Sequence, residues 1–209
     1  WVAKKTPEER AADARKTIDL AVQASLEKGL TSFQDAGESF ATVDVLKQAA
    51  ADGALRIRLW VMVRDSNENL QARLKQYRAV GLNNNHLTIA AIKVVADGAL
   101  GSRGAWMLAP YSDSPSSVGL PTNSPESIAQ TAQLALEHDV QLCVHAIGDR
   151  ANREVLNVYE RAFKSRPGQQ DRRWRVEHAQ HISAADIPRF GQLGVIPVMQ
   201  GIHATSDAP

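Results

Sequence analysis

Two histidines close two apolar runs of the chain, and they are the side chains best suited to chemistry. His145 ends the run 142–145, and His178 ends the run 174–178. Neutral imidazole is the commonest protein ligand for metal ions. Two imidazoles at neighbouring strand ends would therefore form part of a metal site. The alternative is an ordinary pair of hydrogen-bonded, partly buried histidines.

The spacing of the histidines indicates which elements would position them. They lie 33 residues apart. A (β/α)8 barrel uses about 250 residues for its eight strand–helix units, which is roughly 31 residues per unit. Adjacent parallel strands would then carry the two side chains next to each other, at the end of the strands where such barrels keep their catalytic groups.

Strand and helix patterns alternate from one end of the chain to the other. The predicted strands are 30–33, 56–63, 87–95, 141–145, 173–178 and 195–199, and the predicted helices are 7–28, 40–51, 67–80, 125–138, 149–164 and 183–193. This alternation requires parallel pairing with helical crossovers. The sequence therefore predicts an α/β fold, a TIM-type barrel that is incomplete and has about six strand–helix units in one domain, residues 1–209.

Composition narrows the class of protein. The chain has 209 residues, of which 44% are hydrophobic and 22% charged, and a formal net charge of +1. This balance disfavours nucleic-acid and membrane-surface binding and favours a small-molecule substrate. No apolar run approaches the ~20 residues that span a bilayer. The single cysteine, Cys143, is expected to be a core residue. The compartment stays open, with a cytoplasmic location favoured.

The segment 97–124 interrupts the alternation and is rich in Gly, Ser and Pro. It is too long for an ordinary connection, so we expect an active-site loop. Its glycines at 98, 101 and 104 match neither the dinucleotide-binding nor the P-loop spacing. A phosphate-binding α/β protein that uses this loop nevertheless remains an alternative.

Lys93 lies inside the apolar run 91–96. A buried charge in a strand costs several kcal/mol unless it is paired or modified. Either the side chain points to solvent or meets Asp97, or it is a metal ligand, because a carbamylated lysine is an anionic carboxylate that can bridge two ions. The pattern alone leaves both interpretations open.

Four motifs resemble the amidohydrolase superfamily, specifically the branch with N-substituted formamide deformylases. They are the segments 92–105, 144–152, 175–180 and 194–207, which begin Ile-Lys, Val-His, Arg-Val-Glu-His and Gly-Val-Ile-Pro. The resemblance covers most of the chain and is clearest from Leu87 onward.

The resemblance implies a metal site at the carboxyl ends of barrel strands. A carboxylated lysine on the family's fourth strand corresponds to Lys93, and histidines on the fifth and sixth correspond to His145 and His178. The visible strands would be the second to the seventh. The family's first-strand His-x-His and the eighth-strand aspartate, its general base, are missing, and Asp207 is a poor substitute. No catalytic residue is therefore expected within the chain.

The implied cofactor is one or two divalent ions, with zinc expected. Such an ion makes hydroxide available near pH 7 and polarises the substrate carbonyl. The implied reaction is hydrolysis of an amide or another C–N bond. We expect Asp97, Arg103 and His203 to bind substrate or to orient the metal ligands. Glu177 is expected on the opposite face from His178, neutralised by Arg153 or Arg175.

A different class of function is a non-catalytic interaction module. Two unpaired edge strands would also favour self-association, so we expect the isolated chain to be inactive and to form homo-oligomers. A His-x-His upstream and an aspartate-bearing strand downstream would favour the enzyme.

Overall fold

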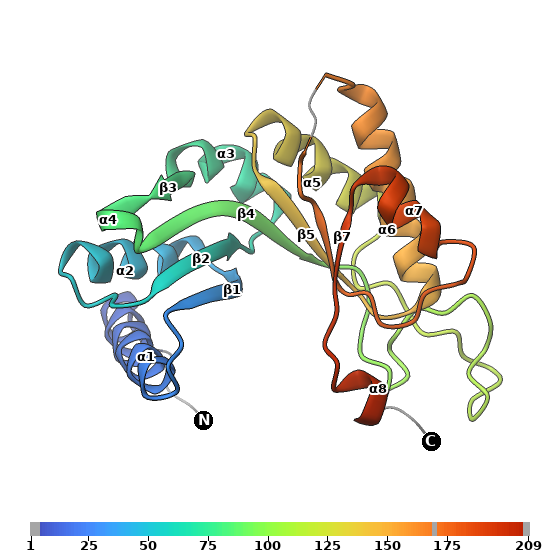
Figure 1. The fold of residues 1–209 in the computed structure, drawn as a ribbon, viewed down its shortest axis with the longest axis horizontal. Coiled ribbons are helices and arrows are strands. Elements are labelled where there is room, and N and C mark those ends of the chain that lie inside the picture. The colour runs from blue at the N-terminus through green and yellow to red at the C-terminus, as the bar shows by residue number, and fades with distance from the viewer. Residues whose placement is uncertain (1–4, 169–170, 207–209) are drawn as a thin grey trace. The chain divides into compact units, whose positions relative to one another are not determined.

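The computed structural model describes residues 5–168 and 171–206. The chain divides into two compact units, residues 1–92 and 93–209. In both units strands are followed by helices (Figure 1). The candidate site residues all belong to the second unit, so the first unit is described only briefly.

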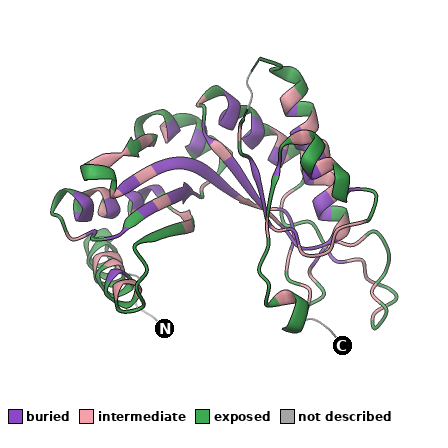
Figure 2. Cartoon of the chain, viewed as in Figure 1, coloured by how far each residue is buried: buried purple, intermediate pink, exposed green. Residues whose placement is uncertain are grey.

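The first unit contains the elements from α1 to the first part of β4. They are α1 (Pro7–Glu27), β1 (Ser32–Glu38), α2 (Phe40–Ala51), β2 (Arg58–Val63), α3 (Asn67–Tyr77), β3 (Ala79–Gly81), α4 (Leu82–Asn85) and the first part of β4 (Leu87–Val95). β1 pairs with β2, and β2 with β4, in parallel. The short β3 pairs antiparallel with β4. Figure 2 shows α1 and β1 largely exposed and β2 and β4 largely buried.

Local sequence explains where the helices of this unit begin. Thr6 is the N-cap of α1: its hydroxyl accepts the N–H of Glu9, and the Glu9 carboxylate accepts the N–H of Thr6. Pro7 follows at the first helical position, where the missing N–H costs nothing. Ser39 caps α2 and Ser66 caps α3 by the same type of bond. Each cap contributes about 1 kcal/mol to stability.

The second unit begins within β4, whose residues 93–95 belong to it. It continues with α5 (Pro125–Glu137), β5 (Gln141–Ala146), α6 (Asp149–Ser165), β6 (Arg175–His178), α7 (Ile187–Leu193), β7 (Ile196–Val198) and α8 (His203–Ser206). The strand order is β4-β5-β6-β7, and β5–β6 and β6–β7 are parallel. Segment 97–124 and α8 extend from the carboxyl ends of these strands (Figure 1).

An aromatic cluster forms much of the core between helix and sheet in this unit. Tyr159 on α6 packs edge-on against Trp174, with ring centroids 4.9 Å apart, and Phe163 lies 5.0 Å from Trp174. The Tyr159 hydroxyl donates to the carbonyls of Leu142 and Arg175. This buried tyrosine therefore ties α6 to both β5 and β6, and it holds these two strands in place.

The predicted alternation of strands and helices is confirmed, with differences at the ends of elements. β1 begins at Ser32 rather than Leu30 and runs on to Glu38, and α7 begins at Ile187 rather than Ser183. The helix predicted to reach Val80 ends at Tyr77, and β3 and α4 follow. Neither short element was expected, because three or four residues are too few to show a period. No helix among the described residues is long and apolar enough to cross a membrane.

Candidate metal centre

His145 and His178 lie side by side, as their spacing predicted. β5 and β6 are adjacent and parallel, with Ala146 opposite His178 in the register. The two imidazole rings meet edge to face with their centroids 4.6 Å apart. Their strands end at the same edge of the sheet, where Ala96 at the end of β4 donates its N–H to the carbonyl of His145.

The backbone leaves the extended conformation at His178. Its φ is +73°, and that of Ala179 is +45°. Regular alternation would put His178 on the same face as Ala146, away from His145. The left-handed turn ends that alternation, so it allows the His178 ring to reach His145. This is a costly conformation for a residue with a side chain, and such strain is typical of functional positions.

The expected position of Glu177 is wrong. In the register Glu177 lies opposite His145, and Arg175 lies opposite Cys143, so all four share one face of the sheet. The Arg175 Nε donates to Glu177 Oε1 at 2.7 Å, and both residues are buried. Alternation relative to His178 fails as a guide because the strand ends at the left-handed turn. Of the two expected partners, Arg175 is the one that neutralises Glu177.

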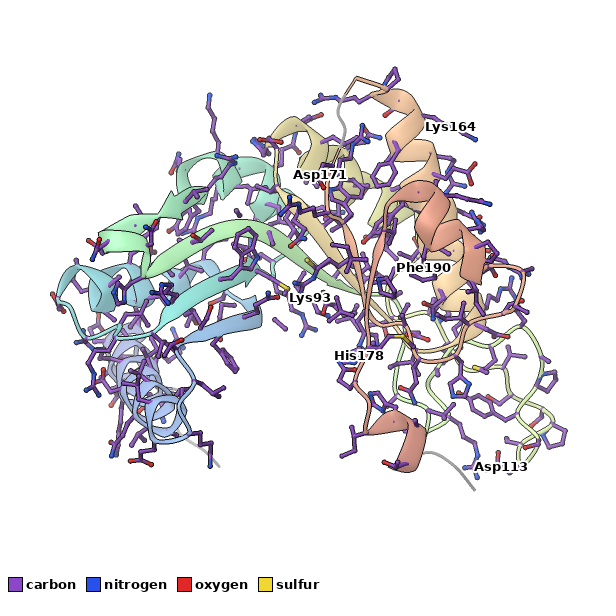
Figure 3. The ribbon with its side chains drawn as sticks, in the orientation of Figure 1. Lys93, Asp113, Lys164, Asp171, His178 and Phe190 are labelled. Carbon is purple, nitrogen blue, oxygen red and sulfur yellow. The ribbon has the colours of Figure 1, made fainter. Side chains whose placement is uncertain are left out.

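Lys93 belongs to the same polar region. It is 7% exposed, which excludes the interpretation that its side chain points to solvent. Its Nζ donates to the carbonyl of Val94, and its charge acts on both the Cys143 thiol and the His178 ring. Burial raises the pKa of the Cys143 thiol to about 12, so Cys143 is a core residue, as predicted, and not a nucleophile. Figure 3 labels Lys93 and His178.

Partial burial lowers the pKa of His178, and the nearby His145 and Lys93 lower it further. The ring nitrogen Nδ1 is 2.8 Å from Gln200 Oε1. A lowered pKa keeps the imidazole neutral over a wider pH range, and neutral imidazole is the form that binds metal ions.

Asp97 is completely buried and holds three backbone N–H groups. Its Oδ1 accepts the N–H of Ile147 at 2.9 Å, and its Oδ2 accepts those of Gly148 and Trp106, each at 2.8 Å. The same Oδ1 lies 3.5 Å from His145 Nε2, a buried atom with no hydrogen-bond partner. Asp97 thus fastens the end of β4, the start of α6 and the segment between them around His145.

The segment 97–124 is also held at the amino end of α6. Asp149 is the first residue of α6, and its carboxylate accepts the N–H of Leu108 at 2.7 Å. Gly148 packs so closely that a Cβ there would lie 2.0 Å from the Trp106 carbonyl oxygen. These contacts hold the segment in place beside the strand ends.

Arg103 forms an exposed ion pair with Asp113, with Nη2 and Oδ2 2.8 Å apart. Figure 3 shows Asp113 far out in segment 97–124, away from Lys93 and His178. The structure therefore brings Arg103 to Asp113 and not to the histidine pair. The glycine-rich start of this segment bonds to itself, since the N–H groups of Gly98, Gly104 and Ala105 donate to carbonyls within 98–105.

His203 joins the histidine pair through a pocket. The pocket has a volume of about 460 Å³, and its lining includes His178, His181, Gln200 and His203. The ring centroids of His178 and His203 are 6.1 Å apart. Sequence reasoning missed Gln200, which was present in a motif but had no role, because its partners lie on two other elements and follow no period. Asp207 lies outside the described residues.

The residues present would form part of the coordination shell of a metal ion. Within residues 5–168 and 171–206, no three His, Cys, Asp or Glu side chains are grouped to hold an ion. The two histidines with Lys93 make a group of three only if the lysine is carbamylated, since an ammonium group has no lone pair. His145 Nε2, buried and without a hydrogen bond, shows that the ring is not satisfied by the protein alone.

The fold and the site together define a class of protein, in which parallel strand–helix units carry paired histidines where the strands end. The chain belongs to the amidohydrolase family, which matches residues 2–208. It is 30% identical over 218 residues to Protein LONG AFTER FAR-RED 3 of Arabidopsis thaliana, covering 100% of the chain. It is 29% identical to the putative amidohydrolase YtcJ of Bacillus subtilis, covering 92%.

Solved structures agree with this family. A metal-dependent hydrolase of Pyrococcus furiosus has a TM-score of 0.80 and 25% identity over 94% of the chain. One from Pyrococcus horikoshii has a TM-score of 0.79 and 29% identity over 94%. The predicted fold class, an incomplete TIM-type barrel, is thereby confirmed. The chain spans 36% of the length of both sequence relatives and 40% and 38% of the two structures.

Proposed function

We propose that this chain carries the metal-binding strands of a hydrolase that cleaves amide or other C–N bonds with water. The observation that carries the proposal is the histidine pair, with rings 4.6 Å apart at the ends of adjacent strands in a chain of the amidohydrolase family. The alternative function, a non-catalytic interaction module, does not explain two imidazoles in contact beside a buried lysine.

Lys93, His145 and His178 would hold one or two divalent ions, which we propose to be zinc. Imidazole nitrogen and carboxylate oxygen are both zinc ligands, and Lys93 would supply the oxygen as a carbamate. When bound, a divalent ion lowers the pKa of water to about 7 and polarises a carbonyl group.

The other residues of the centre position the ligands and receive the substrate. Asp97 accepts the N–H groups of Ile147 and Gly148, just after His145, and its Oδ1 lies 3.5 Å from His145 Nε2, so it fixes the backbone beside that ring. His203 lines the 460 Å³ pocket beside His178, where it can contact a small amide. Arg103, already paired with Asp113, is assigned no part.

Proton transfer requires a group that is not already engaged, and the described carboxylates beside the histidines are engaged. The carboxylate of Asp97 is committed to three N–H groups, and that of Glu177 to Arg175. We therefore place the general base outside this chain, in keeping with the 36–40% of its relatives' length that the chain spans. The expected substrates are small amides, with N-substituted formamides first among them.

The test is hydrolysis by the complete gene product. Release of amine from a panel of N-substituted formamides and simple amides is measured with added zinc, after chelation, and in His145→Ala and His178→Ala variants. We expect turnover to fall by at least ~100-fold in each variant and after chelation. A mass increase of one CO₂ at Lys93 would support the carbamate.

His138→Ala is the matched control, because His138 is the C-cap of α5 and is outside the pocket. It should keep wild-type turnover. Near-normal turnover in a folded His145→Ala or His178→Ala variant, or turnover that survives chelation, would contradict the proposal. A phosphate-binding role gains no support, since N–H groups of the glycine-rich segment are already bonded within it.

A further inference from the structure

Gln200 lies between two histidines of the centre. Its Oε1 is 2.8 Å from His178 Nδ1 and 3.2 Å from His203 Nε2. Its Nε2 faces the carbonyl of Val198 at 3.5 Å. The amide nitrogen is thus turned towards the end of β7, and the amide oxygen towards the two rings. One side chain from the β7–α8 connection therefore contacts a residue at the end of β6 and the first residue of α8.

The chemistry of the amide oxygen determines where the ring protons are. A carbonyl oxygen has two lone pairs and no proton, so it can only accept hydrogen bonds, and it can accept two. Both ring nitrogens that face it must then carry protons. A neutral His178 has its proton on Nδ1 in this arrangement, and its lone pair is on Nε2. A neutral His203 has the opposite tautomer, with the proton on Nε2.

We propose that Gln200 is a positioning residue that selects the Nδ1–H tautomer of His178 and so makes Nε2 the ligand atom. The part about the tautomer depends only on the contacts, whereas the part about the ligand atom rests on the proposed function. A histidine that binds a metal through one nitrogen generally donates the other N–H to an acceptor of the protein. Gln200 supplies that acceptor for His178.

The decisive measurement is the tautomer of His178 in the metal-free chain. Two-bond ¹H–¹⁵N correlation spectra of the imidazoles at pH 8.5 distinguish Nδ1–H from Nε2–H, and free histidine prefers Nε2–H. We expect Nδ1–H at His178 in the wild type and in Gln200→Glu, which keeps an acceptor oxygen. Gln200→Leu, which has none, should shift His178 towards Nε2–H. A wild-type His178 with Nε2–H, or an unchanged Nδ1–H in Gln200→Leu, would overturn the proposal.

Zinc affinity, measured by titration calorimetry on the same proteins, tests the second part. We expect Gln200→Leu to bind zinc about 10- to 100-fold more weakly than wild type, and Gln200→Glu to recover most of this loss. Gln192→Leu, at an exposed glutamine of α7, is the matched control and should bind as the wild type. Equal affinity of Gln200→Leu and wild type would refute the positioning of the ligand atom.

The two measurements separate the failure of this proposal from that of the proposed function. If the wild-type chain binds no zinc although His178 is Nδ1–H and responds to Gln200→Leu, the tautomer assignment is supported and the metal-binding role is what fails. If zinc binds and the tautomer does not respond to Gln200→Leu, the metal-binding role stands and the role of Gln200 is overturned.

Discussion

The two units use carboxylates at their strand ends in different ways. In the first unit, Asp35 and Glu38 on β1 share a side-chain hydrogen bond, and burial raises the pKa of both. The neighbouring Asp35 raises that of Glu38 further. In the second unit, Asp97 and Asp149 bond to backbone N–H groups instead. Burial and the neighbouring charge oppose ionisation of the first pair, whereas the second pair holds a long segment in place.

The comparison shows how the surroundings of the histidine pair differ from the corresponding part of the first unit. Both halves of the chain contain strand–helix units, yet among the described residues histidines close strands only in the second unit. There the segment 97–124 is long, and the buried Asp97 together with Asp149 fixes it beside the imidazoles. In the first unit Ser39 caps α2 directly after β1, so the connection itself needs no such support.

The largest effect is expected for Asp97→Ala. The variant leaves three buried N–H groups without their charged acceptor, and each such bond contributes about 1.5–3 kcal/mol. We expect the free energy of unfolding in urea to fall by more than about 3 kcal/mol. Asp97→Asn keeps one acceptor oxygen, so its free energy of unfolding should lie between those of the wild type and Asp97→Ala. A loss below about 1 kcal/mol would show that the segment is held by other contacts.

Gly148→Ala should have the next largest effect. The added Cβ would lie 2.0 Å from the Trp106 carbonyl oxygen, so segment 97–124 must move away from α6. Overpacking of this kind costs about 1–3 kcal/mol. Urea unfolding measures it, and Gly101→Ala in the same segment is the control, because nothing lies within 4 Å of that position. Equal stability of the two variants would contradict the close fit.

The exposed pair in the same segment should matter less. Arg103 and Asp113 are 50% and 62% exposed, and exposed pairs contribute about 0–1 kcal/mol. Asp113→Ala should therefore change the melting temperature little, in contrast to Asp97→Ala. A large loss would mean that the tip of the segment, and not the buried Asp97, determines its structure.

The smallest effect is expected in the first unit, for Glu38→Gln. Because folding raises the pKa values of Asp35 and Glu38, their protonated forms favour the folded state. This contribution to stability is complete below the unfolded-state pKa, near 4. It is lost as pH rises through the folded-state values. Relative to wild type, Glu38→Gln should thus gain stability between pH 4 and pH 7, on the order of 0.5 kcal/mol. Thermal melts at both pH values test this, and a pH-independent difference would contradict the repulsion.

Much of the fold could be predicted because its signals are local. The capping box of Thr6 and Glu9 and the Ser124–Pro125 start of α5 mark helix beginnings within four residues. The spacing of His145 and His178 predicted that β5 and β6 are neighbours, because a strand–helix unit has a nearly constant length. These features depend on residues close in sequence or on a repeating length.

The remaining features depend on contacts that no period encodes. The three bonds of Asp97 involve residues 9, 50 and 51 positions away, and Gln200 reaches His178 from 22 positions away. The face of Glu177 was wrong because an extended strand was assumed beyond the point where it ends. The residues of β3 and α4 are too few, and the run Asn83–Asn85 adopts positive φ, which apolar patterns do not report.

The left-handed turn at His178 and Ala179 also has a consequence for redesign. Grafting the two imidazoles onto a regular pair of parallel strands would separate them, because a straight strand presents them on opposite faces of the sheet. A transplanted centre must therefore carry the turn with it. At residue 179 a β-branched replacement would oppose this backbone conformation.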